Sequence, residues 1–208
     1  VADNGRLYQS YLGKKLNHEA DISHLPQGTE AYITHGMEDY FEPAIHILHN
    51  DGNPSLLLKY VSHETKAVSQ GVNETIITLG DDKYPVTVKL HYVTYPAEDI
   101  IKTYTEISHK EKKNVKLNQF ASAYLPVRKG NVWLSSLYGA WANEARLVQE
   151  PLEPGMKVIK NKDGVRNSHT AHAEVMFSLD GQPRENSGRV IGAALCYGGN
   201  YKLRIDTD

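Results

Sequence analysis

The stretch "PVTVKLHYVTYP", residues 85–96, decides the fold class because its side chains alternate in polarity with a period of two. Apolar side chains occupy the even positions from Val86 to Tyr92, and polar side chains occupy the odd positions from Thr87 to His91. Successive side chains of a β-strand point to opposite faces, so this pattern predicts a strand with one buried and one exposed face.

Similar runs lie on both sides of this stretch, separated by turn signals in which Gly or Pro accompanies Asn or Asp. One of them, residues 100–110, has the Glu and Lys content of a short helix, but its density of Ile and Thr favours a strand. No amphipathic helix of about three turns is evident. We therefore expect an all-β fold, a large antiparallel β-sandwich, formed as a single domain over residues 1–208. The expected strands are 55–63, 74–80, 85–96, 100–110, 115–127, 132–138, 157–161, 174–180, 189–198 and 201–206.

The bulk composition excludes several classes of function. A net charge of −2 over 208 residues provides no basic field for nucleic acid or anionic lipid, and no run of about 18 apolar residues indicates a membrane span. Cys196 is the only cysteine, so the chain forms no internal disulfide. Because the sequence begins at Val1 rather than Met, we expect an exported protein, periplasmic or secreted, rather than a cytoplasmic one.

The stretch "RNSHTAH", residues 166–172, places His169 and His172 three residues apart. That spacing puts two imidazoles on one face of a helix but on opposite faces of a strand, and this segment leads into an expected strand. A structural zinc ion usually has four ligands, often including Cys, and Cys196 belongs to a different run. A metal site is therefore the less favoured reading, and we expect Ser168 and His169 to hydrogen-bond the loop backbone.

No self-contained active site is evident in the sequence. Glycosidases use two facing carboxylates, but the adjacent acidic pairs at 38–39 and 81–82 should point apart from each other. His46 and His49 flank apolar residues before a turn and are expected at solvent-facing strand positions. No serine nucleophile elbow, phosphate-binding glycine loop or Cys–His pairing is present.

In the stretch "LYGAWANEARLV", residues 137–148, Gly139 interrupts the strand pattern just before Trp141. Such a glycine often marks a bulge or an outward turn. Trp141 is then either an anchor in the core, which the residues alone favour, or a platform for a flat ligand face.

Several motifs together resemble one known family. The sequence resembles the amino-terminal β-supersandwich domain of the family 36 glycoside hydrolases, the bacterial α-galactosidases, over residues 6–206, which implies a galactose-mutarotase-like fold. It departs from the family pattern at Phe41, where the family has Arg, and at Asn167 and Gly198, where the family has Ser. The motifs that carry the resemblance are, in order, "HGMEDYFEPA" (35–44), "LYGAWANE" (137–144), "RNSHTAH" (166–172), "MFSLD" (176–180) and "GRVIGAALCYGGNYKLRID" (188–206).

The resemblance implies that the parent protein is a retaining α-galactosidase acting through a covalent glycosyl-enzyme. In this family the catalytic aspartates lie on a (β/α)₈ barrel that follows the sandwich, so we expect this chain to be a fragment with no catalytic residue, no metal and no cofactor. The sandwich packs on the barrel and contributes loops to the rim of the active site, in some members that of a neighbouring subunit. A homo-oligomeric parent is therefore expected.

The resemblance also moves the expectation for Trp141 from the core to the mouth of the barrel, where its ring could stack on a sugar. Asp39 and Tyr40 are expected at the same rim, with Asp39 bound to a sugar hydroxyl or holding a loop. The residues expected to brace the sandwich or its interface with the barrel are Arg166, Ser168, His169 and Asn200.

Three hypotheses follow, in decreasing order of preference. The first is a non-catalytic domain of an α-galactosidase, which predicts no hydrolysis by this chain. The second is a stand-alone carbohydrate-binding module, which predicts sugar binding by these residues alone. The third is a small metal-dependent enzyme, which predicts bound metal that is lost on His169→Ala or His172→Ala.

Overall fold

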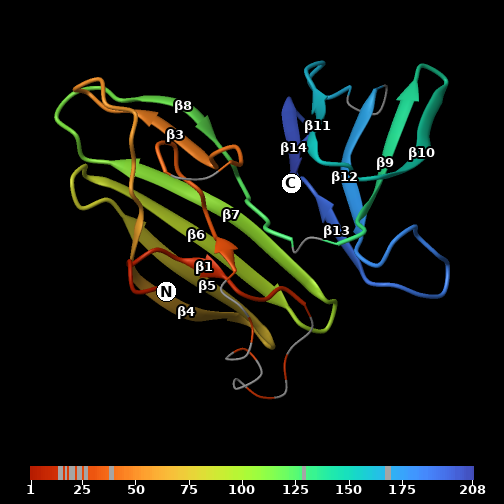
Figure 1. Ribbon diagram of the computed structural model, residues 1–208, viewed down its shortest axis with the longest axis horizontal. Helices are drawn as coiled ribbons and strands as arrows, with labels where there is room; N and C mark the ends of the chain where they lie inside the picture. The colour runs from red at the N-terminus through yellow and green to blue at the C-terminus, as the bar shows by residue number, and fades with distance from the viewer. Residues whose placement is uncertain are drawn as a thin grey trace. The chain divides into compact units, whose positions relative to one another are not determined.

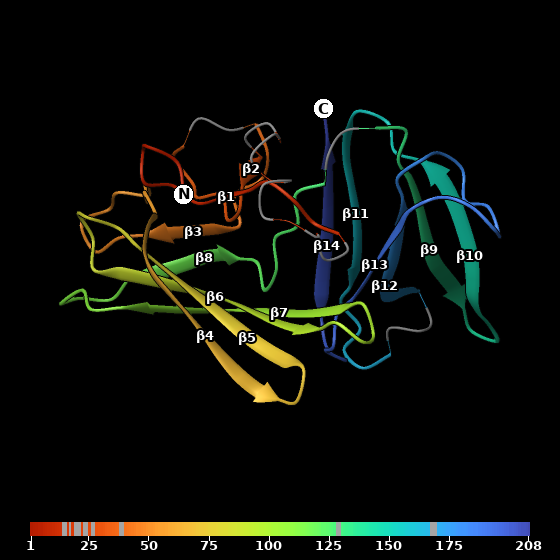
Figure 2. The same ribbon diagram turned by 90° about the horizontal axis from the view of Figure 1, so that it is seen from below.

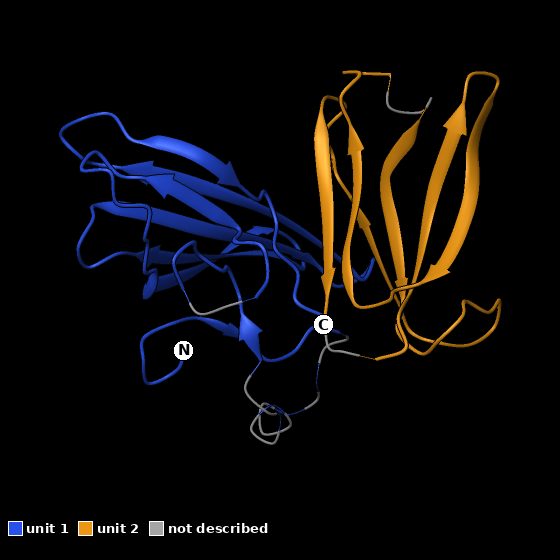
Figure 3. Cartoon of the chain, turned by 45° about the horizontal axis from the view of Figure 1, so that its top comes forward, with its two compact units in different colours: residues 1–127 blue, residues 128–208 orange. Residues whose placement is uncertain are grey.

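The computed structural model describes residues 1–13, 16, 18, 22, 25, 28–37, 40–127, 130–166 and 170–208. Its named elements, within these residues, are fourteen β-strands, labelled β1 to β14 in Figure 1. The strands divide between two compact units, Val1–Val127 and Arg128–Asp208 (Figure 3). The all-β antiparallel architecture expected from the alternating runs is confirmed. That the two units act together as a single domain over residues 1–208 stays a prediction.

The first unit is built around a four-stranded antiparallel meander (Figures 1 and 2). Its strands follow one another in sequence because short turns connect them. The turn between β4 and β5 contains Gly71 at φ 75°, a left-handed backbone that glycine adopts without steric cost. The strands of the meander are β4 (Lys59–Ser69), β5 (Val72–Gly80), β6 (Val86–Tyr95) and β7 (Ile100–His109).

Two shorter antiparallel pairs complete the first unit: β1 (Tyr8–Gln9) with β2 (Thr29–Glu30), and β3 (Ile45–Leu48) with β8 (Lys116–Phe120). Side chains of β3 pack against the apolar face of the meander to form one buried core. Val88 of β6 is completely buried, as are Ile45 of β3 and Leu56 before β4. Full burial of such a side chain contributes about 1.5–3 kcal/mol, so this core accounts for the packing of the two layers.

The second unit is a smaller sandwich of two antiparallel sheets. One sheet has the order β10 (Asn143–Pro151), β9 (Trp133–Ala140), β12 (Ala171–Ser178), β13 (Val190–Ala194). The other pairs β11 (Gly155–Asn161) with β14 (Tyr201–Thr207). Leu134, Ile159 and Val175 come from different strands and meet in one buried cluster, and the Tyr201 hydroxyl donates to the Ala171 carbonyl at 2.9 Å.

The sequence pattern missed strand β10 altogether. Its side chains are exposed on both faces along nearly the whole strand, which lies at the edge of its sheet. Without a buried face there is no alternation to detect. Gly139 also proves to lie inside β9, and the chain reverses only at Trp141 and Ala142.

The alternation that identified β6 holds only in its first half. His91 and Val93 lie on the face expected to be exposed, yet both are buried. His91 is covered by the Tyr104 ring, which stacks on it at 4.2 Å between centroids, and by Glu74, which is 2.9 Å from its Nδ1. In the described part of the chain no helix is both long enough and apolar enough to span a membrane.

Candidate functional site

The hairpin between β9 and β10 carries the most exposed tryptophan of the described chain at its tip. Ala140 pairs with Asn143, so Trp141 and Ala142 alone form the connection. The Trp141 side chain is 81% exposed, whereas Trp133 at the other end of β9 is only half-buried. The structure therefore excludes the core position that the residues alone favoured for Trp141, and the exposed ring is compatible with the alternative of a platform for a flat ligand face.

The backbone that presents Trp141 is strained. Ala142 and Ala145 adopt φ values of 56° and 57°, in the left-handed region that non-glycine residues avoid. Such a conformation costs about 1–2 kcal/mol per residue relative to the right-handed one. The register of β10 also shifts between Asn143 and Arg146. Strain retained at a loop tip is a recurrent feature of ligand-contacting segments, which makes this hairpin the first candidate site.

Tyr40 is the second predicted contact residue that the structure describes, and its side chain is completely exposed. It belongs to the first unit, whereas Trp141 belongs to the second. Asp39, predicted beside Tyr40, lies outside the described residues, as do Ser168 and His169. Phe41, which replaces the family's arginine, is partly buried.

Asn200 and Arg166 lie in two loops of the second unit that are hydrogen-bonded to each other. The Asn200 side-chain oxygen accepts from the Gly164 amide at 2.9 Å, and the Asn161 side chain donates to the carbonyls of Gly164 and Gly199 at 2.6 and 3.1 Å. Arg166 follows this loop and is exposed. The geometry is compatible with the bracing role expected of Asn200, which stays a prediction.

His172 of β12 lies beside Glu174, with 3.7 Å between His172 Nδ1 and Glu174 Oε2. A metal ion would need further ligands close by. Among the residues with a described placement, no three His, Cys, Asp or Glu side chains are grouped to hold one. The adjacent carboxylates at 81–82 do point apart: Asp81 accepts the amides of Lys83 and Leu57, while Asp82 binds Lys59.

A buried His–Glu pair in the first unit was not anticipated, and its position corrects the solvent-facing placement expected for His49. The His49 side chain is completely buried and that of Glu111 is 2% exposed, with 2.7 Å between His49 Nδ1 and Glu111 Oε1. The Tyr84 ring stacks on His49 at 3.6 Å between centroids. No local pattern signals this pair, because 62 residues separate its members.

Hydrogen bonds determine the charge state of Glu111. Burial raises the pKa of Glu111, but the bonds from His49 and from the backbone and side chain of Asn50 outweigh it and hold that pKa below its usual value. Glu111 is therefore an acceptor, and His49 Nδ1 donates to it. His49 Nε2 lies 3.1 Å from the Ser55 carbonyl. Both ring nitrogens of His49 therefore face oxygen atoms, and the buried ring is held from two sides.

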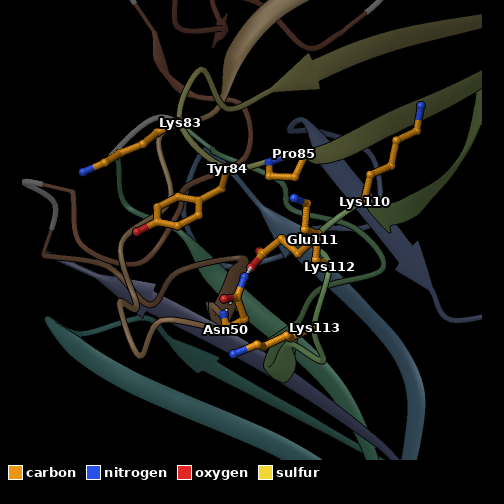
Figure 4. A pocket seen from close by; sticks show the side chains of 8 residues that line it. All are labelled: Asn50, Lys83, Tyr84, Pro85, Lys110, Glu111, Lys112 and Lys113. Atoms are coloured by element: carbon orange, nitrogen blue, oxygen red, sulfur yellow. Dashed lines mark hydrogen bonds between the residues drawn. The ribbon is translucent and has the colours of Figure 1, made fainter.

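Next to this pair the surface is hollowed by about 400 Å³ (Figure 4). Tyr84 and Glu111 line the hollow together with the lysines of the segment 110–113 and Lys83. Its lining lacks the paired, facing carboxylates of a glycosidase active site.

Comparison with known proteins identifies the family. The family model described as "Glycosyl hydrolase family 36 N-terminal domain" matches residues 5–208. Alpha-galactosidase Mel36A of Lactobacillus acidophilus is 24% identical over 100% of this chain and 33% of its own length. Alpha-galactosidase 2 of Pediococcus pentosaceus is 26% identical over 85% of this chain and 26% of its own.

Solved structures share the fold. The galactosidase domain of the alpha-galactosidase-sucrose kinase AgaSK has a TM-score of 0.88 at 21% identity, covering 100% of this chain and 33% of that one. The alpha-galactosidase from Lactobacillus brevis has a TM-score of 0.86 at 21% identity, covering 100% of this chain and 32% of that one. The chain thus spans about a third or less of the length of these relatives. On the match over residues 5–208, the chain belongs to the N-terminal domain family of glycosyl hydrolase family 36.

Proposed function

We propose that this chain is the non-catalytic N-terminal domain of a retaining α-galactosidase. The observation that carries the proposal is the family match over residues 5–208, joined to relatives that are named α-galactosidases and are about three times as long. The remaining two thirds of such a protein leave room for a (β/α)₈ catalytic barrel, on which this domain packs.

The described carboxylates support this division of labour. Retaining hydrolysis needs two carboxyl groups about 5–5.5 Å apart on either side of the scissile bond. Glu111 and Glu74, the carboxylates hydrogen-bonded to buried histidines, each serve a structural pair. We therefore assign the nucleophile and the acid/base to the catalytic domain and none to this one.

The contribution of this domain to catalysis is a set of loops at the rim of the active site. Trp141 at its strained hairpin tip stacks on the apolar face of a sugar, with Tyr40 and Asp39 as further rim contacts. Such a stacking contact is worth about 0.5–1.5 kcal/mol. In a homo-oligomeric parent these loops reach the active site of either the same or a neighbouring subunit.

The proposal is tested by an aryl α-galactoside assay on the 208-residue chain and on the full-length protein that contains it. Activity in the full-length protein alone is the expected outcome. Activity in the isolated chain would overturn the proposal, because the catalytic carboxylates would then lie within this sequence. Calorimetric titration of the isolated chain with galactose or melibiose distinguishes a stand-alone binding module, which would bind without the rest of the protein.

Trp141→Ala in the full-length protein tests the rim contact directly. Loss of a stacking contact of about 0.5–1.5 kcal/mol should lower kcat/KM by between twofold and about tenfold. The free energy of unfolding should not change, because the side chain is 81% exposed. Val165→Ala is the matched control, since Val165 is 83% exposed in the same unit. Equal kcat/KM values for the two variants would remove Trp141 from the substrate site.

A further inference from the structure

Four lysines surround the hollow of the first unit. Three of them belong to the segment "KEKK", residues 110–113, and the fourth is Lys83 in the turn before β6. The volume of about 400 Å³ is in the range of small-molecule sites. All the residues that line it lie within Val1–Val127, so the hollow belongs entirely to one compact unit.

The backbone that carries these lysines is held in place by other contacts. The Lys110 amide donates to the Pro85 carbonyl at 2.8 Å, which joins the end of β7 to the start of β6. Asp81 accepts the amides of Lys83 and Tyr84 at 2.7 and 2.8 Å and fixes the turn. The base of the hollow is thus preorganised, and only the lysine side chains need to move when a ligand enters.

The charge of the hollow is not neutralised from within. Its one lining carboxylate, Glu111, is bonded to His49 and Asn50 and to none of the four lysines. Among the described residues, no hydrogen bond or ion pair is made by the side chain of Lys83, Lys110, Lys112 or Lys113. Four lysines therefore line one hollow in a chain whose net charge is −2.

We propose that this hollow is an anion-binding site for a phosphate group. An oxyanion that carries about two negative charges is attracted by every lysine around the hollow. In Figure 4 the side chains of Lys83 and Lys110 extend to opposite sides, so the ammonium groups form a wide rim. Lysine is a compact point charge on a flexible stem, so the site selects charge more than shape.

Inorganic phosphate is the first probe. It is titrated into the full 208-residue chain at constant low ionic strength, with NaCl as the balancing salt, while NMR follows the amides of residues 83–84 and 110–113. Saturable shifts at these amides are expected. Raising the ionic strength from about 0.02 M to about 0.5 M should weaken binding severalfold, because exposed charges are screened.

Matched variants test the lysines. Lys112→Gln with Lys113→Gln should weaken phosphate binding at least fivefold, on the order of 1 kcal/mol for the two charges removed. Lys112→Arg with Lys113→Arg keeps the charges and should retain binding. Lys89→Gln with Lys202→Gln, two exposed lysines outside the hollow, makes the same change in net charge and should alter binding less than about twofold.

A hexose phosphate, tested beside inorganic phosphate, identifies the source of the phosphate group. Clearly tighter binding of the sugar phosphate assigns a phosphorylated sugar, and equal binding assigns free phosphate; both outcomes support the site. The proposal is overturned if the shifts do not saturate, if chloride alone reproduces them, or if the Lys89/Lys202 control weakens binding as much as the Lys112/Lys113 variant. The readout is binding rather than hydrolysis, so its outcome is independent of the proposed galactosidase role.

Discussion

Replacing Glu111 by alanine is expected to destabilise the first unit more than any other single change to a charged side chain in it. The substitution removes the acceptor that faces His49 Nδ1 at 2.7 Å and the Asn50 backbone amide at 3.1 Å. The Asn50 side chain loses the same partner. His49 is completely buried, so no water replaces the carboxylate at its ring.

The magnitude follows from this burial. A hydrogen bond to a charged group contributes about 1.5–3 kcal/mol, and removing the carboxylate leaves a completely buried ring nitrogen without its acceptor. Asn50 is exposed and regains water, so the contact with His49 dominates and the expected loss is about 3 kcal/mol. With a urea m-value of about 2 kcal/mol/M for a unit of this size, the midpoint should fall by about 1.5 M.

Urea unfolding followed by far-UV circular dichroism measures the loss in the whole chain. An internal control is available because both tryptophans, Trp133 and Trp141, lie in the second unit. Tryptophan fluorescence therefore follows the unfolding of the second unit. The part of the circular dichroism change that does not coincide with the fluorescence transition comes from the first unit. Glu64→Gln, at an exposed surface pair with Lys66, is the matched charge control and should have little effect.

Two further variants separate charge from packing. Glu111→Gln keeps an oxygen acceptor and should cost less than alanine. The double variant His49→Phe with Glu111→Leu removes both polar side chains but keeps a ring to stack on Tyr84, so it should be more stable than Glu111→Ala. A loss below about 1 kcal/mol for Glu111→Ala would refute the reasoning, because a buried ring nitrogen cannot be left without its acceptor at so small a cost.

The remaining predictions concern pH, backbone strain and the core. Because the pKa of Glu111 in the folded chain lies below its usual value of 4.5, its ionisation stabilises the fold above that pH, and this stabilisation is lost as the pH falls through the folded pKa. Urea midpoints between about pH 5 and pH 3 should therefore fall more in the wild type than in Glu111→Gln. Ala142→Gly should stabilise the second unit by roughly 0.5–1 kcal/mol, because glycine adopts the left-handed backbone without strain. Ala140→Gly in the same hairpin should destabilise that unit. Thermal unfolding measures both changes, and a change of the same sign for the two variants would contradict the assigned strain. Leu134 is completely buried, so Leu134→Ala should lower the free energy of unfolding in urea by about 3 kcal/mol. The Leu147 side chain is 56% exposed, so Leu147→Ala should lower it by less than about 0.5 kcal/mol. Similar losses for the two variants would refute the assigned core.

Local patterns were sufficient for the strands that have one covered face. The alternation from Val86 to Leu90 predicted β6 because burial on one side selects apolar residues at every second position. The same physics explains the failure at β10, whose residues face solvent on both sides and are free to be polar. The motifs from "HGMEDYFEPA" to "GRVIGAALCYGGNYKLRID" were likewise enough to indicate the family that the comparison confirmed.

The candidate sites depended on contacts that no local pattern records. Trp141 was ambiguous in the sequence, and only the structure places it in a two-residue hairpin, with Ala142 in the left-handed region and the Trp141 side chain 81% exposed. His49 and Glu111 lie 62 residues apart, and each alone looks like an ordinary surface residue. Periodicity reports how one strand is covered, whereas a charge buried against a distant partner, or a lysine cluster around a hollow, exists only once separate strands are packed together.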